Sequence, residues 1–141
     1  MRSGAARSSW TLPAIGAALL GLPVAVAAGE ENELLGTWRN PRNSVHVDLV
    51  HCGQAMCGVV VWASDKAKAD AREKGSDPLV GTNLLRNFVR IGDRNWRGKV
   101  FVPDLDKTVS GTVTLIDSTS FRARSCALGL FCQTQVWTRV S

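Results

Sequence analysis

The chain has 141 residues, 45% of them hydrophobic, and carries 17 Lys and Arg against 12 Asp and Glu, a formal net charge of +5. This length suits one domain, and opposite charges are interspersed without a Lys/Arg block, so we expect no nucleic-acid partner. Two arginines lie in the first 28 residues, which leaves 15 basic against 12 acidic side chains, or +3, in the rest.

Residues 1–28 have the pattern of a secretory signal peptide. The two arginines precede an apolar stretch, and Ala25-Val26-Ala27 supplies the small residues that signal peptidase requires. Cleavage after Ala27 and cleavage after Ala28 both fit, and the alternative is an uncleaved N-terminal anchor. We therefore expect a periplasmic or secreted protein whose mature part, residues 29–141, has no membrane span.

Short runs of β-branched and aromatic residues follow, separated by turns rich in Gly, Asn, Asp and Pro. This spacing predicts an all-β antiparallel meander in a single domain. The expected strands are a short one at 36–38 and longer ones at 45–51, 57–63, 84–91, 99–102, 108–116, 119–125 and 132–140. Residues 64–75 interrupt the pattern, and they predict either one short exposed helix capped by Ser64 or Asp65 or a mobile loop.

Four cysteines form two close pairs, Cys52/Cys57 and Cys126/Cys132. Three pairings are possible, and an exported chain favours disulfides. We favour the two local bonds, because hairpin tips at 53–56 and 127–131 would place each pair directly across a ladder, within disulfide reach. The spacings do not suit zinc, and no C-x-x-C motif is present, so we expect neither a metal nor a cofactor.

Aligning Cys52 with Cys57 gives the first hairpin one almost wholly apolar face. That face is expected to point inward, and it consists of Val45, Val47, Leu49, Val60 and Trp62. The same register places His46 and His51 on opposite faces, which argues against a catalytic histidine pair.

Aligning Cys126 with Cys132 places Phe121 opposite Trp137, with Arg139 on the same face. An inward guanidinium requires a partner, because burial of an unpaired charge is costly. Trp38, near the start of the chain, is the natural partner. Gly36-Thr37-Trp38 together with Arg139 resembles the closure of lipocalins and calycins, in which a tryptophan of the first strand meets an arginine of the last. The resemblance implies a small antiparallel meander barrel of about eight strands.

A longer series of motifs resembles the exported bacterial family called domain of unknown function 2147, over residues 34–140. The motifs, in order, are Gly36-Thr37-Trp38, Met56 to Trp62, Asp77 to Gly81, Trp96 to Pro103 and Gln133 to Arg139. The chain departs from the family pattern at two places. Only Asp77-Pro78 and Gly81 remain of a longer N-P-D-P segment, and the turn after Pro103 lacks the family's usual tyrosine. The family name carries no established activity, so the resemblance implies no catalytic residue.

The chain contains no Ser-His-Asp order, G-x-S-x-G, H-E-x-x-H or P-loop, and we expect no enzyme activity. The leading hypothesis is an exported, monomeric, non-catalytic binding or envelope-accessory protein that holds a small amphiphile in an open barrel end. The candidate contacts are Gln133, Gln135, the segment 84–88 with Phe88, and Trp96, which is the tryptophan expected to be exposed. One alternative is a protein-binding module, or an inhibitor of an envelope enzyme, acting through residues 65–83. A second alternative is that the protein is an enzyme. Whether the barrel is solid or hollow is left open.

Overall fold

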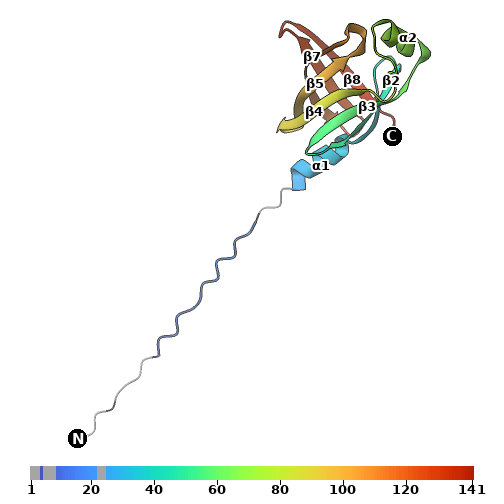
Figure 1. Cartoon of the computed structure of the whole chain (residues 1–141). Helices are drawn as coiled ribbons and strands as arrows, with labels where there is room; N and C mark the ends of the chain where they lie inside the picture. The colour runs from blue at the N-terminus through green and yellow to red at the C-terminus, as the bar shows by residue number, and fades with distance from the viewer. Residues whose placement is uncertain (1–3, 5–8, 22–24) are drawn as a thin grey trace.

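A computed structural model describes residue 4 and residues 9–21 and 25–141, so the predicted leader lies partly outside the described residues. The chain forms a closed antiparallel barrel of eight strands, each paired with the next, and the last strand pairs back with the first (Figure 1). The elements are α1 (Ala25–Leu34), β1 (Gly36–Arg39), β2 (Val45–Cys52), β3 (Ala55–Ala63), α2 (Asp65–Glu73), β4 (Asn83–Gly92), β5 (Asn95–Val102), the 3-10 helix η1 (Pro103–Leu105), β6 (Lys107–Asp117), β7 (Ser120–Ala127) and β8 (Phe131–Arg139). The predicted meander barrel is confirmed.

The insertion after β3 is a helix. The Ser64 hydroxyl caps it by accepting a hydrogen bond of 3.1 Å from the backbone N–H of Ala67. A Ser or Asp at this position satisfies a backbone donor that the first helical turn leaves unpaired. Ala71 is buried against the barrel, so the helix also has a small apolar contact. Of the two predicted alternatives, the helix is therefore the one the chain adopts.

Strand β5 begins four residues earlier than predicted. The turn after β4 is tight, and Gly92 already pairs with Asn95, so Trp96 is a strand residue. Its side chain points into the barrel and is 2% exposed. The prediction that Trp96 is the exposed tryptophan is therefore wrong, because the charged residues around it occupy the turn and the outer face.

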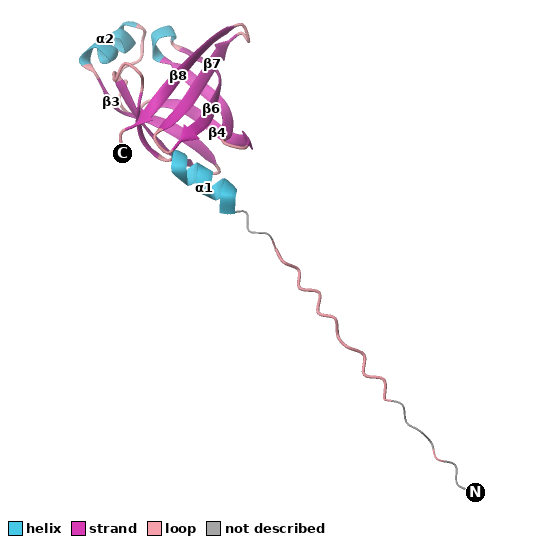
Figure 2. Cartoon of the chain, turned by 180° about the vertical axis from the view of Figure 1, so that it is seen from behind, coloured by secondary structure: helices cyan, strands magenta, loops and turns pink. Residues whose placement is uncertain are grey.

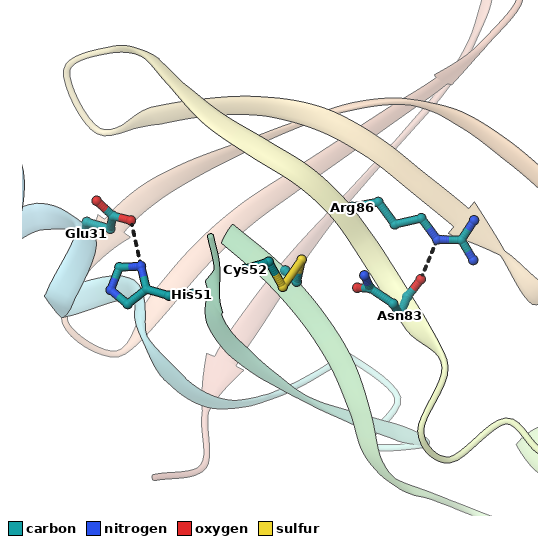
Figure 3. The surroundings of a disulfide bond; sticks show 6 residues. Glu31, His51, Cys52, Asn83 and Arg86 are labelled. Atoms are coloured by element: carbon teal, nitrogen blue, oxygen red, sulfur yellow. Dashed lines mark hydrogen bonds and ion pairs between the residues drawn. A yellow bond between two sulfur atoms is a disulfide. The ribbon is translucent and has the colours of Figure 1, made fainter. Parts of the chain in front are cut away.

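The register of the β2–β3 hairpin also differs from the prediction. Its turn is Gly53-Gln54, so Cys52 pairs with Ala55 and Cys57 with Val50. The two cysteines are diagonal neighbours with Cα atoms 5.8 Å apart, and their disulfide still forms (Figure 3). The C-terminal pair follows the prediction: Cys126 lies directly opposite Cys132, with a Cα separation of 4.0 Å, and the disulfide ties this hairpin.

A β-bulge near the other end of the β2–β3 hairpin turns Trp62 outward. Val47 pairs with Val60 but His46 pairs with Trp62, so Val61 is an extra residue on β3. Such a bulge reverses the side-chain alternation beyond it. Trp62 is 43% exposed and its ring lies 4.5 Å from that of His46, which corrects the prediction of an inward Trp62. The inward placement of Val47 and Val60 is confirmed.

The middle of the barrel is filled by Phe88. Gly98 and Gly111 face each other across β5 and β6. A Cβ atom on Gly98 would lie 2.6 Å from the Phe88 ring and 2.6 Å from the Arg86 carbonyl oxygen. The two glycines therefore leave the space that the Phe88 ring occupies, and Phe88 is 1% exposed.

The barrel closes where β1 meets β8, a seam with only two paired residues on each strand. The Arg139 guanidinium lies over Trp38, 4.2 Å from the ring centroid. It donates to the carbonyls of Leu35 at 2.9 Å and Ser118 at 2.7 Å, and also to that of Glu33. The Trp38 indole N–H donates to the Leu34 carbonyl at 2.8 Å. These contacts fasten residues 33–35 across one end of the barrel.

We predict that Arg139→Met lowers the free energy of unfolding by about 3 kcal/mol. The variant keeps the length of the side chain but loses the charged donors and the cation–π contact, and it leaves partly buried carbonyls without this donor. Urea unfolding measures the change. Arg122→Met on the exposed face of β7 is the matched control and should change stability by at most about 0.5 kcal/mol. Equal losses for the two variants would contradict the closing role of Arg139.

We also predict that Gly98→Ala lowers the free energy of unfolding by about 1–3 kcal/mol, because the added methyl group overpacks the Phe88 ring. Gly92→Ala is the control, since a Cβ atom there meets open space. Thermal and urea unfolding of both variants provide the comparison. A Gly98→Ala protein as stable as the control would show that Phe88 is not tightly held.

Candidate functional site

The two ends of the barrel differ in what covers them. Helix α1 lies at the end closed by Arg139, whereas α2, η1 and the β7–β8 tip surround the opposite end (Figure 2). The antiparallel order of the strands places the β1–β2 connection, residues 40–44, at this second end as well. Residues 40–44, α2 and η1 line an open mouth, and the β7–β8 tip projects beside it.

A cavity of about 670 Å³ opens at this mouth. Its volume lies within the range of small-molecule sites. Its apolar wall is formed by Val45, Val47, Leu79, Leu84, Leu85, Val100, Phe101, Val102, Ala123 and Trp137. Strands β2, β4, β5, β7 and β8 contribute residues to its wall.

Polar side chains surround the entrance. Gln133 and Gln135 lie on the inward row of β8, opposite Ser125 and Ala123 of β7, and all four line the cavity. Both glutamines are exposed although they point inward, which shows that this part of the barrel interior is open to solvent. The remaining polar lining residues are Asn40, Arg42, Ser44, Ser64, Lys66, Asp70, Asp104 and Arg124.

The charges at the rim are partly paired. The Lys66 ammonium donates a hydrogen bond of 2.7 Å to the Asp70 carboxylate, one helical turn further along α2. This hydrogen bond and the charge of Asp70 raise the pKa of Lys66 above its ordinary value. Lys66 therefore stays protonated at neutral pH and is held at the rim.

Trp137 connects the cavity to the core beneath it. Its ring stacks on Phe121 with centroids 5.9 Å apart, and Phe121 meets Trp38 edge-on at 4.9 Å. The Trp137 indole N–H is buried and has no hydrogen-bond partner among the described residues. A buried donor without a partner typically costs about 1–3 kcal/mol.

The structure brings together two of the four predicted contact residues. Gln133 and Gln135 line the cavity, whereas Phe88 and Trp96 lie in the core and are absent from the lining. Trp137, predicted to be a core residue, both packs on the core and lines the cavity. Of the predicted segment 84–88, Leu84 and Leu85 line the cavity. Sequence reasoning missed Val100, although the inward–outward alternation of its strand could have found it.

The segment predicted to contact a protein partner forms one side of the cavity instead of standing apart from the barrel. Lys66, Ala67 and Asp70 of α2, together with Leu79, line the mouth. Leu79 is 4% exposed and belongs to the core cluster. Within residues 65–83, Leu79 therefore packs on the barrel, whereas the Lys66 side chain is 85% exposed.

The two histidines lie at opposite ends of β2. His46 Nε2 is 2.6 Å from the Asn43 side-chain oxygen, and His51 Nδ1 is 3.2 Å from the Glu31 carboxylate (Figure 3). Neither histidine lines the cavity. Among the residues that the structure describes, no group of three or more His, Cys, Asp and Glu side chains could hold a metal ion.

In the described parts of the chain, every helix is too short or too polar to cross a membrane.

The search of curated proteins finds no significant match. A solved structure, titled "Protein HP1028 from the human pathogen Helicobacter pylori belongs to the lipocalin family", is similar with a TM-score of 0.58 and 16% identity, over 77% of this chain and 83% of that one. This likeness shows the shared barrel fold. The sequence profile described as "Uncharacterized protein conserved in bacteria (DUF2147)" matches residues 36–139, and the chain belongs to this family.

Proposed function

We propose that the protein is an exported, non-catalytic binding protein that holds one small amphiphile in the cavity at the open end of the barrel. The observation that carries the proposal is a cavity of about 670 Å³ with an apolar wall and a polar entrance. Ligand sites in proteins combine a mostly apolar lining with a few placed polar groups, and barrels of eight strands hold at most one small ligand.

The lining favours an amphiphile over a plain hydrocarbon. An apolar tail would contact Leu85, Val100 and Trp137, while Gln133 and Gln135 offer donors and acceptors to a polar head. The solved neighbour is titled a lipocalin-family protein, and we infer a similar use of the barrel here from the cavity.

Export is the second part of the proposal. The leader pattern at 1–28 and the two disulfides, with no free cysteine among the described residues, support an oxidising compartment such as the periplasm. The mature protein would then be a single barrel domain over residues 29–141. Cleavage there leaves residues 33–35, which Arg139 and Trp38 hold, in place.

We predict that Gln135→Trp lowers the affinity for a dye-labelled dodecanoate at least tenfold, because the indole ring fills the cavity entrance. Thr134→Trp is the matched control. It adds the same ring to the preceding residue of β8, which faces outward, and this variant should bind the dye as tightly as wild type. Titration of the purified protein by fluorescence measures both. Equal affinities for the two variants would show that the probe binds elsewhere.

Native mass spectrometry of the protein purified from its own periplasm tests the same proposal without a chosen probe. We expect a fraction of molecules to carry one retained compound, with both disulfides closed, and Gln135→Trp to lose that compound. A retained mass that is unchanged in Gln135→Trp would count against the cavity as the binding site.

A further inference from the structure

The tip between β7 and β8 is an apolar projection next to the cavity mouth. Leu128, Leu130 and Phe131 are 88%, 81% and 72% exposed. The hairpin that carries them extends at the end of the barrel opposite α1 (Figure 1). The disulfide between Cys126 and Cys132 ties the two strands directly below these side chains. A rigid support therefore presents three large apolar groups to solvent.

The backbone conformation of the tip disfavours a leucine at position 128. Leu128 and Gly129 have φ angles of 54° and 68°, and the Leu130 N–H donates to the Ala127 carbonyl at 3.2 Å. Two positive φ angles define a turn that favours Asn, Asp or Gly at its first central position. A leucine in this left-handed conformation is uncommon and strained. The chain thus exposes an apolar side chain where a polar residue would fit the backbone better.

The outer wall beside the tip is basic. Arg97, Lys99, Arg122 and Arg124 are exposed on β5 and β7, and Arg124 also borders the cavity. Arg97 of β5 and Arg124 of β7 both pair with Thr112 of β6, so the two arginines lie in one row across the sheet. Lys99 and Cys126 both pair with Ser110 and lie in a second row. β5, β7 and β8 carry no acidic residue, and the only one of β6 is Asp117, at the far end of the strand.

The nearest acidic residues at the rim point elsewhere. The Asp106 carboxylate lies beside Gly75, in the connection after α2, and Asp104 acts electrostatically on Lys66. Both acidic groups are therefore directed towards the α2 side of the mouth. The positive charge of the β5–β7 wall has no compensating carboxylate nearby among the described residues.

We propose that this tip docks the protein on an anionic lipid membrane, with Leu128, Leu130 and Phe131 inserted among the headgroups and the basic wall held against lipid phosphates. Apolar side chains that enter the interface, together with nearby Lys and Arg, are the combination that binds anionic bilayers. Arg124 lies four residues from Leu128, about 13 Å along the strand, so a tilted barrel brings its long side chain to the headgroups. The tip is convex, which suits insertion into a fluid surface.

Docking would bring the cavity mouth close to the bilayer, because Ser125 and Gln133, which lie just below the tip, line the cavity. The inference does not depend on the identity of a cavity ligand, and it holds for an empty barrel too. Its test is therefore separate from the dye titration of Gln135→Trp. If the protein binds membranes but not the dye, the docking inference is supported and the proposed function is contradicted.

The test is flotation of the exported, purified protein with vesicles of phosphatidylcholine containing 30% phosphatidylglycerol, and with phosphatidylcholine alone. N-terminal sequencing verifies that wild type and variants share the same processed end. We expect wild type to float with the anionic vesicles. Leu130→Ser/Phe131→Ser should lower the partition coefficient about a hundredfold, and Arg97→Gln/Arg124→Gln about 25-fold for anionic vesicles. Val61→Ser/Ile91→Ser, which replaces exposed apolar residues away from the tip, is the matched control and should float as wild type.

A second readout locates the contact. Phe131→Trp adds a tryptophan at the tip, and vesicles with brominated acyl chains should quench its added emission but not the emission of wild type. Equal flotation of the tip variant and wild type would overturn the proposal. So would a concentration-dependent dimer that the tip variant abolishes without any vesicle binding, because a second copy of the chain would then cover the tip.

Discussion

The stack of Arg139 on Trp38 is the contact on which the rest of the structure depends. A meander barrel becomes closed only where its first and last strands meet, and here that seam has two paired residues on each strand. The guanidinium compensates for this short ladder by binding carbonyls from residues 33–35 and from Ser118, the turn before β7. Charge-assisted hydrogen bonds of this kind are stronger than neutral ones. The Arg139 side chain therefore joins the last strand to residues 33–35, just before the first strand, and helps to cover one end of the barrel.

The same contact determines where the cavity can be. From Arg139 a line of rings runs through Trp38 and Phe121 to Trp137, which lies in the cavity wall. Phe88, seated over the Gly98–Gly111 pair, fills the middle of the barrel beside this line. Large side chains are thus concentrated in the half near α1, and the inward positions of β7 and β8 beyond Trp137 are Ala123, Ser125, Gln133 and Gln135. Small and polar residues at inward positions leave the other half hollow.

This distribution explains how far the sequence could predict the site. The disulfide register of the C-terminal hairpin placed Phe121 opposite Trp137 and Gln135 opposite Ala123, because no bulge disturbs that ladder. The glutamines at the mouth followed directly from the alternation. The N-terminal hairpin misled the prediction because its turn has two residues and Val61 is a bulge, and neither feature has a strong local signal. Trp62 is consequently half-exposed. Trp96 is buried for a separate reason, because β5 begins earlier than predicted.

The unequal ends of the barrel also account for the unequal use of hydrophobic residues on its surface. At the closed end, Leu34 belongs to the segment that Arg139 fastens and is fully buried. At the open end, three apolar side chains of the β7–β8 tip are exposed on a turn whose backbone favours polar residues. Solvation alone would select Asn or Gly there, since exposed leucine adds nothing to the core and the positive φ disfavours it. An exposed leucine in this position is therefore better explained by what the tip contacts than by what it stabilises, and the uncompensated arginines beside it indicate an anionic surface.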